Sequence, residues 1–175
     1  LKLFMENSEY LKNQISIMIN LFKAKRFDTL IDKGLTLLNK FPEQPILYNI
    51  ISLAYNALEK GEESKKLLIQ ILKKEPENFH ILNNLGLASV HCGDTDEAEN
   101  YYNRALKLKP DLIEALVNLG NLKTTQNKND EAKEYFIKAI EINDKLLPPK
   151  LSLAGYYEQS GDFEKAKKIY NEILE

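Results

Sequence analysis

The feature that most constrains this chain is a repeat of 34 residues, seen first where Leu85-Gly86 returns as Leu119-Gly120. Other columns recur at the same spacing, at Ala98, Ala132 and Ala166, at Tyr102, Phe136 and Tyr170, and at Pro42, Pro76 and Pro110. A period between 20 and 50 residues is typical of arrays in which each repeat is one supersecondary unit. The period predicts units at 11–44, 45–78, 79–112, 113–146 and 147–175, together one domain over 11–175.

Each unit has the pattern of two helices joined by a short turn. In 79–112, Leu82, Leu85 and Ser89 share one helical face, and a second helical stripe runs from Ala98 to Leu106. Between them lies the turn 92–95, where Gly93 can adopt the left-handed conformation that ends a helix. Gly61-Glu62 and Gly161-Asp162 resemble this turn. Pro110 ends the second helix because proline cannot continue the hydrogen-bond ladder.

Small residues on both helices predict close packing within a hairpin. Gly86, Gly120 and Ala154 on the first helices are expected to face the alanine column on the second helices. One hairpin cannot bury its apolar stripe alone, whereas stacked hairpins form a continuous core. The predicted fold is therefore all-α, an α-solenoid with a right-handed superhelix of about five helix–turn–helix hairpins. In the first unit, Leu30 stands in the alanine column and Gly34 in the aromatic column, which predicts looser or wider packing there.

These residues resemble the tetratricopeptide repeat pattern. In 79–112 it is carried by Leu82, Leu85, Gly86, Ala98, Tyr102, Ala105 and Pro110. In 113–146 it is carried by Leu116, Leu119, Gly120, Ala132, Phe136 and Ala139, with Asp144 where the pattern has proline. The resemblance covers 11–175 and implies a non-enzymatic scaffold for protein–protein interaction.

The two ends leave alternatives open. Residues 1–10 are either an N-terminal extension, with a helix starting at residues 6–9, or the end of a preceding helix. Repeat arrays usually carry a polar capping element, and none follows the last repeat here. We expect either a segment of a longer protein or self-association through residues 1–5 and 169–174.

Composition excludes several classes of partner. The chain has 24 Lys and Arg against 26 Asp and Glu, and only two arginines, so binding to nucleic acid is not expected. No stretch approaches the roughly 18 apolar residues of a membrane helix. The single cysteine, Cys92, makes no internal disulfide, which favours a reducing compartment and predicts a cytoplasmic protein.

The sequence offers few groups for catalysis or cofactor binding. His80 and His91 are eleven residues apart on one predicted helix, about 16 Å by the helical rise, too far to share a metal. Cys92 has no evident activating neighbour. The phosphate-loop, dinucleotide and zinc-protease motifs do not occur. We predict no enzyme activity, no metal site and no cofactor.

The remaining candidate for function is a binding surface. In this fold the first helices line the concave side of the superhelix. Its predicted inner positions include Ile15, Ile19, Phe22, Asn49, Leu53, Asn83, Asn84, Asn118, Asn121, Thr124, Thr125, Ser152, Gly155 and Gln159. An asparagine side chain can pair with both the N–H and the C=O of a peptide backbone. We expect Asn84 and Asn118, one repeat apart, to hold an extended partner segment.

Other inner residues are expected to assist this pair. Asn49, Asn83 and Asn121 would add hydrogen bonds, and Ile15, Ile19, Phe22 and Leu53 would supply apolar pockets. The arrangement resembles the asparagine ladder of O-linked N-acetylglucosamine transferases, with two matching rungs. A carboxylate clamp for a C-terminus is not expected, since Ile15 and Ile19 occupy its lysine and asparagine positions. The alternative function is a substrate-recruiting region of a larger enzyme, such as a glycosyltransferase or sulfotransferase.

Overall fold

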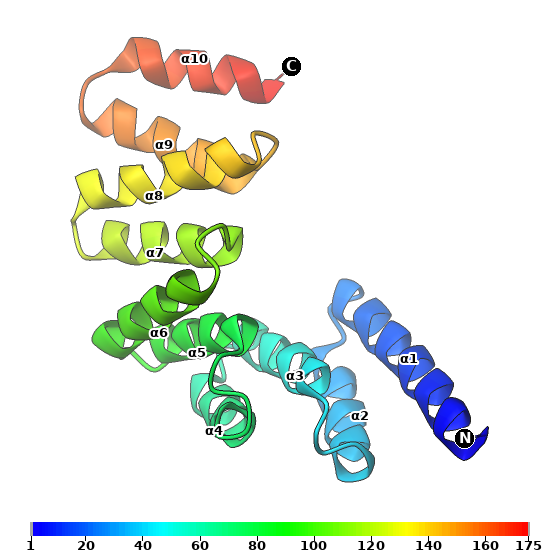
Figure 1. Cartoon of the computed structure of the whole chain (residues 1–175). Helices are drawn as coiled ribbons and strands as arrows, with labels where there is room; N and C mark the ends of the chain where they lie inside the picture. The colour runs from blue at the N-terminus through cyan, green and yellow to red at the C-terminus, as the bar shows by residue number, and fades with distance from the viewer. Residues whose placement is uncertain (1, 175) are drawn as a thin grey trace. The chain divides into compact units, whose positions relative to one another are not determined.

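The computed structural model describes the backbone of residues 2–174 and the side chains of residues 7–174. Within that range the chain is helical, with ten α-helices and no strand. The helices are α1 (Lys2–Lys23), α2 (Phe27–Lys40), α3 (Pro45–Ala57), α4 (Gly61–Leu72), α5 (Phe79–His91), α6 (Thr95–Leu108), α7 (Ile113–Thr125), α8 (Asn129–Ile142), α9 (Leu147–Gln159) and α10 (Phe163–Leu174) (Figure 1). The chain divides into two compact units, unit 1 up to Ala98 and unit 2 from Glu99 onward.

The helix starts follow the predicted period. The helices α3, α5, α7 and α9 begin 34 residues apart, and so do α2, α4, α6, α8 and α10. The prediction of an all-α chain of about five helical hairpins is therefore confirmed. The expected helix start at residues 6–9 is wrong, because α1 runs through them from Lys2. The side chains of residues 1–5, invoked for self-association, lie outside those described.

Each hairpin turn has one residue in the left-handed conformation, always at the same position of the repeat. Gly93 has φ 82° and Gly161 has φ 79°, as expected for glycine. The corresponding residues in the other turns are Lys25, Glu59 and Asn127, with φ between 55° and 59°. Gly61 was expected in such a turn, and this is wrong. It is buried at the start of α4, where a Cβ atom would lie 2.6 Å from the Ala88 carbonyl oxygen.

The first and fourth hairpins have their large and small interior residues at exchanged positions. Between α7 and α8, a Cβ on Gly120 would meet the ring of Phe136, 2.8 Å from its Cδ1 atom. In α2, the residue at the position of Phe136 is Gly34, where a Cβ would lie 2.9 Å from the Met18 Cε atom. Met18 stands at the position of Gly120 and is fully buried. The first hairpin thus exchanges the large and small residues of the fourth, and the looser packing expected there stays a prediction.

In unit 2 the core is a cluster of Ala132, Phe136 and Leu153, with Tyr157 and Ile169 packed against it. This cluster joins α8 to α9 and α10, so the last three helices share one apolar interior. Among the described helices, none has both the length and the apolar character that crossing a membrane requires.

Candidate functional site

Unit 1 buries two of its three predicted inner asparagines, Asn83 and Asn84, and leaves Asn49 half-buried. Asn84, on α5, is 5% exposed, and its side-chain amide donates to Asn49 Oδ1 at 3.2 Å and to Ser52 Oγ at 3.4 Å. The Asn83 amide donates to Asn84 Oδ1 at 3.4 Å. The Asn84 side chain therefore contributes to the contact between α3 and α5, which removes it from the surface where a partner would lie.

Asn56 belongs to the same buried group. The Asn56 side-chain amide donates to the backbone carbonyl oxygen of Asn84 at 3.3 Å. The Oδ1 atom of Asn56 is buried without a hydrogen-bond partner. A buried acceptor without a partner is costly, so such groups are usually satisfied by an ordered water. We call Asn49, Ser52, Asn56, Asn83 and Asn84 the α3–α5 polar cluster.

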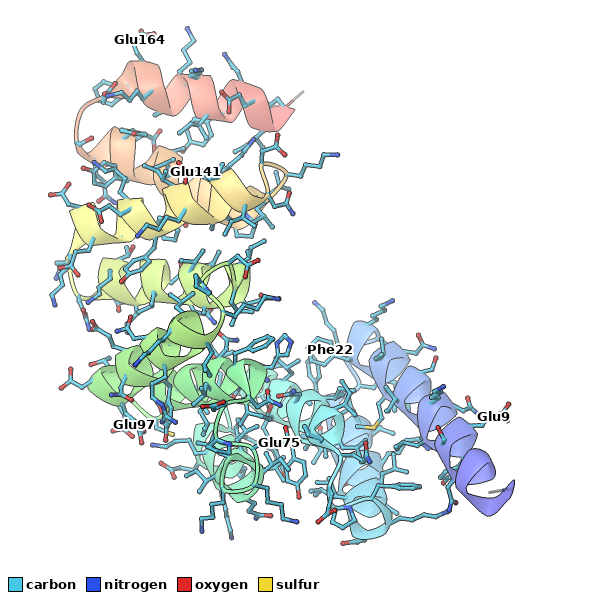
Figure 2. The ribbon with its side chains drawn as sticks, in the orientation of Figure 1. Glu9, Phe22, Glu75, Glu97, Glu141 and Glu164 are labelled. Carbon is cyan, nitrogen blue, oxygen red and sulfur yellow. The ribbon has the colours of Figure 1, made fainter. Side chains whose placement is uncertain are left out.

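The apolar inner residues of unit 1 keep part of their surface. Ile19 is 41% exposed on α1, and Leu53 is 36% exposed on α3. Ile15 is half-buried, and Phe22, labelled near the C-terminal end of α1 in Figure 2, packs edge-on against Phe27 with 5.3 Å between ring centroids. These four residues therefore present apolar surface, and all are more accessible than Asn83 and Asn84.

Unit 2 contains a pocket of about 390 Å³ between α7, α8 and α9. Six of its lining residues are predicted inner positions of the first helices, namely Asn121, Thr124, Thr125, Ser152, Gly155 and Gln159. The second helix α8 adds Asn129, Ala132, Lys133 and Phe136, and α9 adds Tyr156. The volume falls within the range of ligand pockets, about 300–1,000 Å³. We call this the α7–α9 pocket.

The pocket has an apolar floor and a polar wall. Ala132 and Phe136, each 2% exposed, form the floor. Thr124 and Thr125 donate their hydroxyl protons to the carbonyl oxygens of Gly120 and Leu122, so their oxygens are left as acceptors. At Gly155 a Cβ atom would meet nothing within 4 Å, so the missing side chain leaves open space.

The charged side chains near the pocket, Asp130 and Lys133, both contact Tyr156 and so connect α8 to α9. The Tyr156 hydroxyl donates to Asp130 Oδ1 at 2.5 Å, and Lys133 Nζ lies 5.0 Å from the centre of the Tyr156 ring. The hydrogen bond to Asp130 raises the pKa of Tyr156, and burial acts in the same direction. A hydrogen bond with Lys133 opposes this shift without reversing it, so the phenol stays protonated at neutral pH. Lys133 is thereby held at the wall of the pocket.

A buried lysine on α7 forms ion pairs with carboxylates on α6 and α8. Lys123, 3% exposed at the end of α7, pairs with Glu99 on α6 at 2.6 Å and with Glu131 on α8 at 3.2 Å. Burial disfavours its charge, but the hydrogen bonds to both carboxylates outweigh this effect and raise the pKa of Lys123. The hydrogen bond from Lys123 in turn lowers the pKa of Glu99. Two carboxylates from different helices are thus neutralised beside Thr124.

The groups considered for catalysis are not among the residues that line the pocket. His80 and His91 are exposed on α5. Burial and a hydrogen bond to Glu62 raise the pKa of Cys92 to about 11, which disfavours a reactive thiolate at neutral pH. Among the described residues, no three His, Cys, Asp or Glu side chains are grouped as metal ligands.

Two family models, each described as a tetratricopeptide repeat, match residues 77–145 and 150–175. The chain carries tetratricopeptide repeats. The matches cover the hairpins with the regular small and aromatic columns, and the degenerate first hairpins lie outside them. No curated protein sequence matches the chain significantly.

Solved structures share the tetratricopeptide-repeat fold at low identity. The Thermus thermophilus protein TTC0263 matches with a TM-score of 0.82 at 16% identity, covering 93% of this chain and 89% of that one. MamA matches with a TM-score of 0.71 at 20% identity, covering 90% and 92%. The structure of Naa15/Naa10 bound to HypK-THB matches with a TM-score of 0.61 at 22% identity, covering 90% of this chain and 24% of that chain.

Sequence reasoning missed the pocket residues on α8. Lys133 and Asn129 lie on a second helix, and the inner positions had been sought only on first helices. Phe136 had been assigned to packing alone, although its ring also forms the pocket floor. A signal was present in Gly155, which stands at the position of Asn121 and of Leu87 in the preceding repeats. A glycine at a position that otherwise carries a side chain indicates open space.

Proposed function

We propose that this chain is a non-enzymatic protein-interaction scaffold that holds an extended segment of a partner protein, with the α7–α9 pocket as a principal contact. The observation that carries the proposal is the pocket itself, where residues from three helices converge on an open space at Gly155. Its amide and hydroxyl groups suit a peptide backbone, and its apolar floor suits a buried side chain.

Within this proposal the predicted residues take different roles. Asn121 is exposed on the pocket wall and is placed to pair with a peptide backbone. Asn118 is half-buried on the same helix and stays a predicted contact. In unit 1 the apolar group Ile15, Ile19, Phe22 and Leu53 would contact partner side chains. Asn84, Asn49 and Asn83 have less support as direct contacts, because they bond to one another inside the α3–α5 polar cluster.

The test is a substitution that fills the pocket without disturbing the core. A C-terminally amidated peptide is first selected on the protein from a random nine-residue library, and its affinity is measured by fluorescence anisotropy. We expect Gly155→Leu to weaken binding at least tenfold, because the leucine occupies the space that a partner side chain would enter.

The matched control is Gly155→Ala, which adds only a methyl group to open space and should bind within about twofold of the native chain. Thermal unfolding of both variants establishes that the fold is intact. A folded Gly155→Leu variant with native affinity would overturn the pocket as the contact site.

A second candidate function is that of a substrate-recruiting region within a larger enzyme. The observation that favours it is the Naa15/Naa10 match, in which a region like this chain forms 24% of a longer chain. The mass of the endogenous protein, measured by immunoblot, tests this candidate. A band near 20.2 kDa would contradict it.

A further inference from the structure

We propose that the partner segment places an acidic side chain, aspartate or glutamate, in the α7–α9 pocket, where its carboxylate pairs with Lys133. The inference rests on the proposed function, since it names the chemistry of the group that the same pocket receives. It goes further because the residue that selects the partner lies on a second helix, outside the inner positions of the first helices.

The pocket lining contains a single charged side chain, which is a lysine. Among the eleven residues that line the pocket, Lys133 is the one with a formal charge at neutral pH, and the others are neutral. This is unusual in a chain where 29% of residues are charged and acids outnumber bases. A cation among neutral lining residues in a partly enclosed wall favours a ligand of opposite charge.

The nearest carboxylate does not compete for this role. Asp130 Oδ1 accepts the Tyr156 hydroxyl at 2.5 Å, so this oxygen is occupied in a bond between α8 and α9. Asp130 is exposed, and it is not among the residues that line the pocket. The pairing therefore positions the Tyr156 ring. The Lys133 ammonium also interacts with the Tyr156 hydroxyl and keeps further N–H donors for a ligand.

The ammonium group is also held in place before a ligand arrives. Lys133 is half-buried, and its Nζ lies 5.0 Å from the centre of the Tyr156 ring, a geometry in which the ring face attracts the cation. An ammonium group has three N–H donors, and the ring does not use all of them. A lysine fixed in this way loses less side-chain entropy on pairing than a free surface lysine.

The rest of the pocket suits the remainder of an acidic residue. The methylene groups of aspartate or glutamate would lie over Phe136 and Ala132 on the floor. The amides of Asn121 and Gln159 stand on the first helices at the wall, where they would bond to the peptide backbone on either side. The space at Gly155 gives the side chain room to enter.

The test uses the C-terminally amidated nine-residue library with the native protein and three variants. We expect the peptides retained by the native chain to be enriched in Asp or Glu at one position. Lys133→Gln should remove this enrichment and weaken a selected acidic peptide about two- to fivefold, as for a partly exposed ion pair. Lys133→Arg keeps the positive charge and should retain the preference.

The matched control is Lys138→Gln, since Lys138 also lies on α8 beside a tyrosine, Tyr135, but does not line the pocket. This variant should select the same peptides as the native chain. Repeating the measurement with a free C-terminus in place of the amide separates a side-chain carboxylate from a terminal one. Tight binding that requires the free C-terminus would overturn the proposed side-chain contact.

The failure of this inference is distinguishable from failure of the proposed function. Retained peptides without an acidic preference, or a preference that survives Lys133→Gln, would overturn the role of Lys133 while Gly155→Leu still abolished binding. Binding that is insensitive to Gly155→Leu would overturn the pocket itself.

Discussion

The two units use asparagine on their first helices in opposite ways. In unit 1, Asn84 is 5% exposed and bonds to Asn49 and Ser52 within the protein. In unit 2, Asn121 is exposed and lines a pocket. Both were predicted inner residues of the same kind. Asn121 stands at the position of Leu87, three residues after that of Asn84, so the comparison shows that predicted inner positions differ in whether the side chain stays open to a partner.

The burial of Asn84 depends on the side chains that accept hydrogen bonds from its amide group. Unit 1 has Ser52 at the position where unit 2 has Gly120, and the serine hydroxyl accepts from Asn84. Gly120 has no side chain and packs against Phe136 instead. The interior is therefore polar at Ser52 in unit 1, whereas at Gly120 in unit 2 it is apolar, with the polar groups at the pocket wall.

The largest effect is expected where unit 2 buries a charge. Replacing Lys123 by methionine leaves Glu99 and Glu131 close together without their cation. We expect a loss of about 3 kcal/mol in the free energy of unfolding, measured by urea denaturation. The control is Lys60→Met, which breaks the exposed 3.8 Å pair with Asp28 and should cost about 0.5 kcal/mol or less. Equal effects of the two substitutions would contradict the structural role of Lys123.

The same substitution should change the pH dependence of stability. Lys123 lowers the pKa of Glu99 in the folded state, so this pairing stabilises the protein above the unfolded pKa of glutamate. The contribution is lost as the pH falls through the lowered pKa. We expect the native chain to lose more stability than Lys123→Met on acidification from about pH 7 to about pH 3. Parallel pH profiles would contradict this pairing.

Two glycines of unit 2 should respond in opposite directions. Gly120→Ala brings a methyl group against the Phe136 ring, so we expect a loss of about 1–3 kcal/mol from overpacking. Gly155→Ala enters open space within a helix and should gain about 0.5–1 kcal/mol from helix propensity. Differential scanning calorimetry checks both values. A stabilising Gly120→Ala would show that α7 and α8 have room to separate.

Asparagine substitutions test the comparison between the units directly. Asn84→Ala leaves Asn49 and Ser52 without a donor, and we expect it to cost about 2 kcal/mol of stability. Asn121→Ala is exposed and should change stability by about 0.5 kcal/mol or less while weakening peptide binding. If Asn84→Ala instead weakened binding with native stability, the predicted asparagine ladder would regain support.

The smallest effects are expected in the hairpin turns. Glu59 has φ 56°, a conformation that strains a side chain, so Glu59→Gly should stabilise unit 1 by about 0.5 kcal/mol. Asn127→Gly in unit 2 should gain less, because asparagine tolerates this conformation better than glutamate. Paired thermal unfolding curves measure the difference. A larger gain at Asn127 would contradict the conformational explanation.

The sequence predicted the fold because the repeat is a local pattern. Helix starts and the hairpin turns at Gly93 and Gly161 follow from a period of 34 residues. Gly120 was expected to face the alanine column, and a Cβ there would instead lie nearest the Phe136 ring. The left-handed Glu59 was missed because no glycine marks it, and Gly61 two residues later suggested the wrong turn position.

The candidate site was predicted less completely. Asn121, Ser152 and Gln159 do line one pocket, because inner positions of neighbouring first helices lie close together. The burial of Asn84 depends on Ser52 and Asn49 from another hairpin, a contact across more than thirty residues that no local pattern shows. Lys133 was missed because its role depends on Tyr156 in the following helix.

The central claim is that a partner segment binds in the α7–α9 pocket. The most direct measurement is a map of ¹⁵N chemical shifts of the protein as a library-selected peptide is added. We predict that the perturbed signals cluster in residues 121–136 and 152–159, including the side-chain amides of Asn121 and Gln159. Perturbations centred on the side-chain amides of Asn49 and Asn84, with residues 121–136 unchanged, would contradict the account.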